Sequence, residues 1–458
     1  MDEQHQPIPE PQRPLIQRTL SEWKILGQLG GPILIAQLAQ MANGVIDTVM
    51  AGHASAVDLA AVGIGSSLWM PLFLLFMGVL SALQPMISGY RGEQRFSRIL
   101  PTTWQGLYVA AGAAALMIVL LINVRPVLDL LSLDTRTAHI TQGYLIAFAW
   151  GIPAMLLLTA LRGLTDGLGH TQVIMAFSVL GTLINLPLNY IFIFGKLGVP
   201  AMGGIGCGWA TALSNMVAAA ALLIYLNTSR TFQAFHLLDS WERPDWPEIR
   251  RILSLGVPIG FTIFVEASLF SVIALFLAPL GPVIVAGHQI ALNVVSLLFM
   301  LPLSIGMALT LRISFLIGAR APATASLLAR SSLIIAAAVA LAMASGLLAF
   351  TREVAALYTD EQPVRAVASA LLIYAALFQI ADVIQVTCIS ALRGYKDTRI
   401  PMLIMLFSFW GVGMTLGYVL TFTDHLVPAM GAAGFWIGLT AGLVSASVLL
   451  GWRLFSHV

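Results

Sequence analysis

The stretch ILSLGVPIGFTIFVEASLFSVIALFLA spans residues 252–278 and contains a single charged residue, Glu266. A helix needs about twenty mainly apolar residues to cross roughly 30 Å of hydrocarbon. Lipid offers no hydrogen-bond partners to the backbone, so a stretch of this kind has to be helical inside a membrane. The stretch therefore predicts a transmembrane helix that carries one acid within it.

The composition of the whole chain agrees with a membrane protein. Of its 458 residues, 58% are hydrophobic and only 10% are charged, whereas soluble domains contain about 25% charged residues. The net charge of +2, with no basic stripe interleaved with aromatics, argues against a nucleic-acid partner. The chain has no GxxxxGK, HExxH or Cys/His spacing that would indicate ATP hydrolysis, a metalloenzyme or a bound cofactor.

Stretches of this kind recur along the chain and predict an all-α integral membrane protein with twelve transmembrane helices. The predicted spans are residues 28–52, 60–88, 104–123, 138–162, 171–195, 205–227, 252–278, 283–310, 325–350, 364–392, 400–422 and 428–452. Most of the 23 Lys and Arg residues fall in the N-terminal segment and in the loops on its side of the membrane. Because these residues accumulate on the cytoplasmic side, both termini are predicted to be cytoplasmic.

The polar gap between the sixth and seventh spans divides the chain into two halves of six spans each. The predicted organisation is a cytoplasmic tail (1–27), a first six-helix bundle (28–227), a cytoplasmic linker (228–251), a second six-helix bundle (252–452) and a C-terminal tail (453–458). Prolines inside the spans, such as Pro153 and Pro187, are candidate kinks, although prolines are also simply common in membrane helices.

Three short motifs recur in the same order in both halves. LGGPILIA (29–36) resembles LGVPIGFT (255–262), ALRGLTD (160–166) resembles ALRGYKD (391–397), and MGGIGCGWA (202–210) resembles MGAAGFWIG (430–438). The offsets of 226, 231 and 228 residues are nearly constant. Since each half has six spans, the copies enter the membrane in the same direction and form a parallel repeat. Binding sites in transporters built from repeats lie near the midplane.

Three acids lie inside predicted spans, and no Lys or Arg occupies a comparable depth: Asp47, Glu266 and Asp382. An ionised acid near the bilayer centre costs about 2.5 kcal/mol or more, so such acids are candidate functional sites. They could be protonated, could bind a metal cation such as Na⁺, or could face a wet cavity that admits a cationic substrate. The alternative is that each is a neutral packing residue held by hydrogen bonds.

Several neutral polar residues could complete these sites. Asn185 and Asn189 lie four residues apart on one helical face and offer oxygen ligands or hydrogen bonds to Asp47, or they connect helices by hydrogen bonds. Gln37, Gln40 and Gln289 could line a cavity, or could instead bond between helices. Arg162 and Arg393 occupy matching positions in the second motif and are expected to be topology anchors.

These residues resemble the multidrug and toxic compound extrusion (MATE) family, and within it the NorM-like branch. The segments that carry the resemblance are VIDTVMAGHASAVDLAAVG (45–63), ALRGLTDGLGHT (160–171), LINLPLNYIFIFGKLGVPAMGGIGCGWATAL (183–213), VPIGFTIFVEASLF (257–270) and ALRGYKDTRIPM (391–402). The resemblance covers nearly the whole chain. It implies two six-helix bundles that form a V, in the inner membrane of a bacterium.

The resemblance also implies a function and a set of residues. The function is antiport of Na⁺ or H⁺ against hydrophobic organic cations, by a protein that acts as a monomer. Asp47, Asn185 and Asn189 match the site in the first half of the family fold, and Glu266 and Asp382 match the cation site in the second half. Phe378, one turn before Asp382, offers no side-chain hydrogen bond, so the ligand set there would be thin.

Two other functions are weighed against export. A flippase for lipid-linked oligosaccharides would have a related helical architecture, but its cavity should be lined with Lys or Arg to hold phosphates, whereas this chain places acids there. An integral membrane enzyme that modifies lipids would need a nucleophile–base pair or a metal cluster near one membrane face. The sequence offers neither, since His53 and His170 stand alone.

Overall fold

The computed structural model describes residues 14–131, 133–232, 235, 237, 241–424 and 428–457. These residues contain helices and no strand. Part of the predicted N-terminal tail and part of the predicted linker lie outside the described residues. The first helix, α1, begins at Leu15 rather than at residue 28 and continues to Ala54.

The helices follow one another with short connections. In the first half they are α2 (Ala56–Leu80), α3 (Leu83–Gly92), η1 (Phe96–Arg98), α4 (Ile99–Ile122), α5 (Arg125–Leu130), α6 (Thr135–Ala149), α7 (Ile152–Gly167), α8 (Thr171–Phe194) and α9 (Gly204–Thr228). In the second half they are α10 (Trp246–Leu277), η3 (Ala278–Leu280), α11 (Pro282–Gly318), α12 (Pro322–Ala349), α13 (Thr351–Tyr358), α14 (Gln362–Gly394), α15 (Arg399–Leu406), the π-helix η4 (Phe407–Met414), α16 (Thr415–Phe422) and α17 (Ala432–His457).

Among the described residues, eleven helical segments are long and apolar enough to cross a membrane. A twelfth is formed by α6 and α7 together, which are bent by 45° at the break between them. Pro153 lies at the start of α7, where it cannot donate the backbone hydrogen bond that would continue α6. The twelve predicted spans and the all-helical membrane fold are confirmed, and the fourth span is a broken one.

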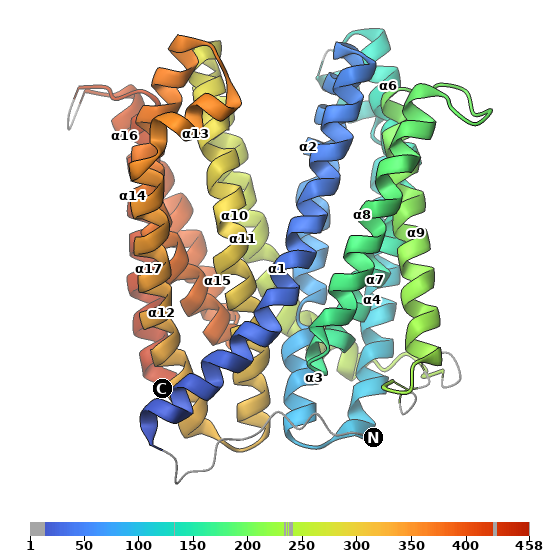
Figure 1. Ribbon diagram of the computed structural model, residues 1–458, viewed down its shortest axis with the longest axis vertical. Coiled ribbons are helices and arrows are strands. Elements are labelled where there is room, and N and C mark those ends of the chain that lie inside the picture. The colour runs from blue at the N-terminus through green and yellow to red at the C-terminus, as the bar shows by residue number, and fades with distance from the viewer. Residues whose placement is uncertain are drawn as a thin grey trace. The chain divides into compact units, whose positions relative to one another are not determined.

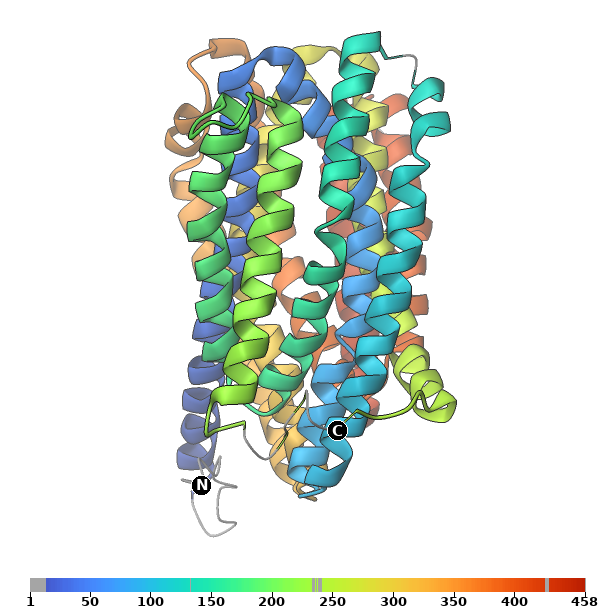
Figure 2. The same ribbon diagram turned by 90° about the vertical axis from the view of Figure 1, so that its right-hand side faces the viewer.

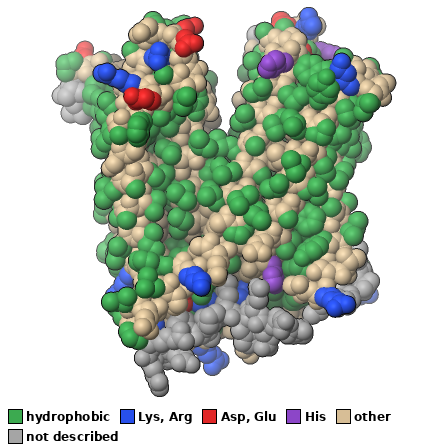
Figure 3. Space-filling view, in the orientation of Figure 1, with side chains coloured by type: hydrophobic (Ala, Val, Ile, Leu, Met, Phe, Trp, Pro, Cys, Tyr) green, Lys and Arg blue, Asp and Glu red, His purple; other side chains and the backbone are tan. Residues whose placement is uncertain are grey.

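The lateral surface of each half is apolar. In Figure 3, hydrophobic side chains cover the flanks of the helices, and charged side chains gather near the helix ends. Large aliphatic residues such as Leu183, Ile224 and Ile334 are more than 60% exposed. A surface of this kind is stable against hydrocarbon rather than against water. The chain is a multi-pass membrane protein.

The chain divides into two compact units. The first unit contains Gly31–Gly260, and the second contains Phe261–Val458 together with Ile8–Gly30. In the first unit α8 and α9 lie side by side (Figure 2). In the second unit α14 lies between α11, α12 and α17 and packs against all three (Figure 1). The helix that carries Asp382 is therefore the central helix of its unit.

The third sequence motif has the same geometry in both units. The backbone N–H of Met202 donates to the carbonyl of Phe192 at 2.9 Å, and that of Met430 donates to the carbonyl of Leu420, also at 2.9 Å. Met202 lies just before α9, and Met430 lies just before α17. Each bond therefore connects the start of one of these helices to the end of the helix before it. Both members of the pair are offset by 228 residues, so the internal duplication is confirmed at this hairpin.

Glycines let the same two helices approach closely. A Cβ on Gly206 would lie 2.7 Å from a backbone carbon of Phe192, and one on Gly434 would lie 2.7 Å from a backbone carbon of Leu420. Both distances are shorter than a carbon–carbon contact allows. Small residues at helix interfaces are the usual means of close packing inside a membrane, which explains why the motif is rich in glycine.

The second sequence motif is in a different register from the one that its letters suggest. Helix α7 ends at Gly167 and α14 ends at Gly394, an offset of 227 residues. A Cβ on Gly167 would lie 2.7 Å from the Cβ of Ile87, and one on Gly394 would lie 2.8 Å from the Cβ of Ile313. The structural equivalents are therefore these two glycines, in agreement with the offsets of the other two motifs.

The match between ALRG at 160–163 and at 391–394 is consequently one helical turn out of register. The prediction that Arg162 and Arg393 occupy equivalent positions is wrong: an offset of 227 places Arg393 opposite Asp166. The two ALRG sequences match because small and aliphatic residues recur every turn in both helices. The helix ends, in contrast, are fixed by packing.

A buried ion pair fixes the first part of α1 to the second unit. Arg312 donates from Nε and Nη2 to the two carboxylate oxygens of Glu22 at 2.6 and 2.7 Å, and both residues are fully buried. A bidentate pair of this kind is geometrically specific. Arg18 and Trp23 add hydrogen bonds from the same part of α1 to Thr324 and Ser331 of α12.

We expect Arg312→Met to lower the unfolding free energy by about 3–5 kcal/mol, because it leaves Glu22 buried without its counter-charge. The measurement is thermal unfolding of the purified protein in detergent. Replacing both residues, as Glu22→Leu with Arg312→Met, should recover most of the loss, since no buried charge is left uncompensated.

The matched control is Arg95→Met. Arg95 pairs with Glu93 at 3.2 Å, but its side chain is 68% exposed, so its loss should change the unfolding free energy by no more than about 0.5 kcal/mol. Equal effects of the two arginine substitutions would contradict the assigned role of Arg312.

Candidate functional site

The acid of the first unit, Asp47 on α1, is held by neutral donors from two other helices. Asn189 of α8 donates from Nδ2 to Asp47 Oδ1 at 2.7 Å, and Thr211 of α9 donates from Oγ1 to Asp47 Oδ2 at 2.9 Å. Asp47 is 8% exposed. The carboxyl group of Asp47 therefore has a hydrogen-bond donor on each oxygen and no basic side chain among these partners.

The two asparagines and Thr211 form a closed ring of hydrogen bonds around this carboxyl group. Asn189 also donates to Asn185 Oδ1 at 2.9 Å, and Asn185 donates to Thr211 Oγ1 at 3.3 Å. The Oδ1 atom of Asn189 is buried and has no partner within the described part of the chain. The site thus offers carboxylate, amide and hydroxyl oxygens, which are the ligand types that bind hard cations and protons.

The structure brings Asp47, Asn185 and Asn189 together as the sequence suggested, and it adds Thr211. One signal in the sequence could have found this residue: it is a polar residue in the helix that follows the two asparagines, directly after the repeated glycine motif at 202–210. Only the packing of α9 against α8 places its hydroxyl group on Asp47.

The two acids of the second unit lie near each other. Glu266 of α10 is close enough to Asp382 of α14 to act on it electrostatically. Glu266 is half-buried and Asp382 is 2% exposed. Neither carboxyl group has a hydrogen bond or an ion pair within 4 Å among the described residues, in contrast to Asp47.

Glu266 has a basic residue within electrostatic reach. Arg393, at the end of α14, acts on Glu266 electrostatically. It lies three turns along the same helix from Asp382, and the interaction is not a direct ion pair. The positive charge therefore acts on Glu266 from the end of α14 without neutralising it by contact.

Aromatic rings pack around Phe378, which lies one turn before Asp382. Phe378 is 2% exposed. The ring of Phe378 lies 6.3 Å from that of Phe270 and 5.7 Å from that of Trp436, in both cases edge to face. Phe378 has no side-chain donor or acceptor, so it provides no hydrogen bond to Asp382.

The three glutamines proposed as cavity residues are used differently. Gln37 accepts a hydrogen bond from Arg162 at 2.9 Å, and Arg162 also bonds to Asp166, so Gln37 belongs to a polar network rather than to the Asp47 site. Gln40 and Gln289 are exposed. Arg162 is a buried member of that network, which is more than a topology anchor requires.

No group of three or more His, Cys, Asp or Glu side chains with metal-binding geometry occurs in the part of the chain that the structure describes. The residues around Glu266 and Asp382 therefore do not fit a tightly bound structural or catalytic metal. Two carboxyl groups without fixed partners instead fit a cation that is bound and released.

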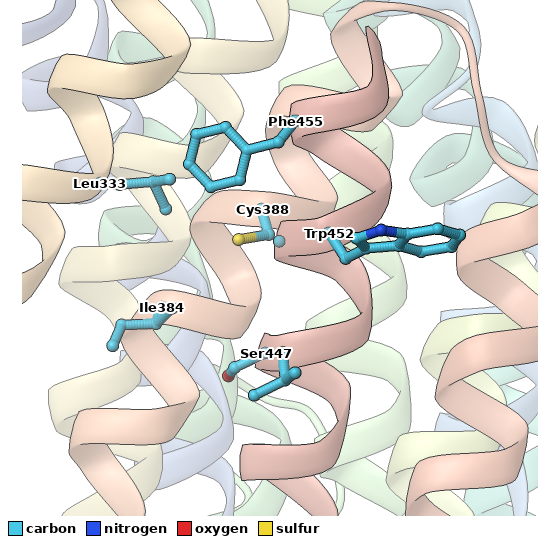
Figure 4. A pocket seen from close by; sticks show the side chains of 8 residues that line it. Leu333, Ile384, Cys388, Ser447, Trp452 and Phe455 are labelled. Carbon is cyan, nitrogen blue, oxygen red and sulfur yellow. The ribbon is translucent and has the colours of Figure 1, made fainter. Parts of the chain in front are cut away.

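An apolar groove of the second unit lies apart from these acids. Figure 4 shows it between α12, α14 and α17, lined among others by Leu333, Ile384, Cys388 and Phe455. It has a volume of about 310 Å³, and its walls are almost entirely apolar. Because none of the three acids lines it, the groove is not the cation site.

Comparison with known proteins agrees with this fold. The MatE family model matches residues 32–191 and 258–419. The chain is 44% identical over 431 residues to the "Probable multidrug resistance protein NorM" of Shewanella oneidensis, with 94% of each chain covered. It is 40% identical over 440 residues to the "Multidrug resistance protein MdtK" of Edwardsiella ictaluri, with 96% of each chain covered.

Solved structures share the fold at lower identity. The eukaryotic MATE transporter AtDTX14 superposes with a TM-score of 0.85 at 20% identity, covering 96% of both chains. The Vibrio cholerae MATE transporter VcmN in its bent form gives a TM-score of 0.84 at 20% identity, covering 96% of this chain and 98% of the other.

Fold and relatives together define a multi-pass membrane transporter and not an enzyme. The chain belongs to the MATE family of multidrug resistance transporters, in its NorM-like branch.

We expect Thr211→Val to lower the unfolding free energy by about 1–3 kcal/mol, because it leaves one oxygen of Asp47 buried without its donor. Thermal unfolding in detergent measures this loss. The control is Thr440→Val in the second unit, where the hydroxyl group bonds only to the carbonyl of Trp436 on its own helix and contributes little. Comparable losses in the two variants would argue against a hydrogen-bonded carboxyl site at Asp47.

Proposed function

We propose that this transporter is a secondary active exporter that exchanges Na⁺ or H⁺ for hydrophobic organic cations by alternating access. The observation that carries the proposal is the pair formed by Glu266 and Asp382, which lie near each other without a hydrogen bond or a close ion pair in the described structure. No tightly bound metal or cofactor takes part in this scheme.

Two neighbouring carboxyl groups in an apolar unit favour a reversible positive partner. If both are ionised, they repel each other and lose their hydration, and both effects are costly in a low-dielectric interior. A proton, a Na⁺ ion or an organic cation removes the repulsion. Because the coupling ion and the substrate would use the same two carboxyl groups, binding of the coupling ion weakens binding of the substrate, which is the requirement for antiport.

Exchange also needs two conformations with different affinities. A ligand that binds both conformations equally shifts no equilibrium. One charge that crosses a potential of 100 mV supplies about 2.3 kcal/mol, which is enough to bias such an equilibrium. Arg393 also supports the scheme. Its fixed positive charge lies at one end of the unit and repels cations, so a cation at Glu266 is less stable toward that end.

The Asp47 site supplies a second position for a cation in the first unit. Its ring of hydrogen bonds satisfies the carboxyl group without a basic residue, so we assign it a proton or Na⁺ rather than a bulky organic cation. The aromatic rings of Phe270, Phe378 and Trp436 near the second pair of acids suit an organic cation better, because aromatic faces attract positive charge.

The alternatives weighed from the sequence receive less support. The relatives are named multidrug resistance proteins, which disfavours both the oligosaccharide flippase and the lipid-modifying enzyme. The bacterial origin of these relatives supports placement in the inner membrane. Each unit has its own buried acids within one chain, which is consistent with function as a monomer in the lipid bilayer.

We expect Glu266→Gln to abolish gradient-driven efflux of ethidium from cells while the protein still inserts at the parental level. The amide keeps the shape of the side chain but cannot release a proton or carry a charge. The matched control is Glu353→Gln on α13, an exposed acid, which should transport normally. Parental efflux by Glu266→Gln would refute the coupling role.

Proteoliposomes identify the coupling ion. Ethidium transport is measured under a Na⁺ gradient alone and under a pH gradient alone, with the same purified protein. The proposal predicts transport under at least one of the two gradients and none without a gradient. Transport of equal rate in the absence of any gradient would show a uniporter and contradict antiport.

A further inference from the structure

The second unit contains buried polar side chains that the described protein does not satisfy. Both ring nitrogens of His288, both amide atoms of Gln379 and Nε1 of Trp436 lie in the interior without a hydrogen-bond partner. The three side chains are at most 1% exposed. None of them takes part in the carboxyl pair described above.

These side chains come from three helices that pack together. The ring of His288 on α11 lies 5.9 Å from that of Trp436 on α17, edge to face. Trp436 in turn lies 5.7 Å from Phe378 on α14. Gln379 follows Phe378 directly, and Asp382 lies one turn further along α14. Phe378 and Asp382 lie four residues apart on one face of α14, so these ring contacts lead from His288 to the face of α14 that carries Asp382.

The path continues beyond the acid. Gln385, three residues after Asp382, is 2% exposed, and its Oε1 atom also has no partner in the described structure. Gln379, Asp382 and Gln385 follow one another at three-residue intervals on one side of α14. We call His288, Trp436, Gln379, Asp382 and Gln385 the polar column.

Unpaired polar groups are unfavourable in such a place. Each buried donor or acceptor without a partner costs about 1–3 kcal/mol, and native interiors leave few of them. Internal water is the usual remedy, since one molecule makes about three hydrogen bonds to groups that the protein does not pair. Four side chains of one column have polar atoms without partners, although Gln385 Nε2 donates to Met405 Sδ at 3.1 Å. A series of water molecules explains these atoms better than independent defects do.

We propose that the polar column binds a chain of internal water that runs from His288 and Trp436 to Asp382. His288 lies six residues after the start of α11 at Pro282, and Trp436 lies four residues after the start of α17 at Ala432. The column therefore begins near the end of the unit where these helices start. The hydration does not depend on the proposed antiport.

A water chain also gives the carboxyl pair a route to solvent. If the antiport proposed above is correct, protons or small hydrated cations reach Asp382 along this chain from the end of the unit at which α11 and α17 begin. This consequence rests on the proposed function, whereas the presence of the water does not.

Radiolytic hydroxyl-radical footprinting of the full-length protein in nanodiscs tests the proposal. A short X-ray pulse produces radicals from water, and mass spectrometry locates the side chains oxidised next to it. We expect His288 and Trp436 to be oxidised at rates close to those of exposed aromatic residues, in spite of their burial. Phe409 and Phe435 are equally buried aromatic residues of the same unit and should stay unoxidised. Protection of His288 and Trp436 to the level of those two residues would overturn the proposal.

Two substitutions test whether the column acts as a unit. Gln379→Leu removes the amide without a large change in volume and should lower oxidation of Trp436 severalfold, because the water loses its partners. The control is Thr387→Val on the same helix, where the hydroxyl group bonds to the carbonyl of Val383 on its own helix, and oxidation of Trp436 should not change. Unchanged oxidation in Gln379→Leu would refute a shared water chain.

The readout separates the two proposals. If efflux proves independent of Glu266 while His288 and Trp436 are oxidised, the antiport scheme fails and the water chain stands. If efflux depends on Glu266 while both residues are protected, the water chain fails and the antiport scheme stands.

Discussion

An acid in an apolar helix has to find its partners within the protein, because the lipid supplies none. The same constraint makes every span a helix, since only a helix satisfies its own backbone, and it makes each interior polar side chain conspicuous. The three acids of this transporter differ in how many partners the protein supplies. Asp47 is surrounded by neutral donors, whereas Glu266 and Asp382 are left without close partners in the described structure.

The two units repeat one another in their scaffold but not in their acids. The hairpin bonds of Met202 and Met430 and the helix ends at Gly167 and Gly394 recur at offsets of 227–228 residues. At the offset of the first motif, Glu266 corresponds to Gln40, which is exposed. The duplication thus gave both units the same helix packing. The positions of the charged residues, in contrast, differ between the units.

The chain also shares helices between its units. The first part of α1 is fixed to the second unit by the buried pair of Glu22 and Arg312, while the rest of α1, with Asp47, belongs to the first unit. A buried pair with bidentate geometry is sensitive to the loss of either partner, so this attachment is a specific one. It couples the position of the Asp47 helix to both units by covalent continuity.

The sequence by itself determined the membrane class, the spans, the duplication and the three acids, because each depends on hydrophobic length, charge and periodicity, which are properties of single segments. It also placed Asn185 and Asn189 on one face beside Asp47. Only the tertiary structure showed that Thr211 completes that site, that Arg393 faces Glu266, that the ALRG motifs are one turn out of register, and that His288, Gln379 and Trp436 share one interior. Those four findings depend on which faces of distant helices meet, and that is decided by close packing at glycines and by helix ends, not by the pattern within any one helix.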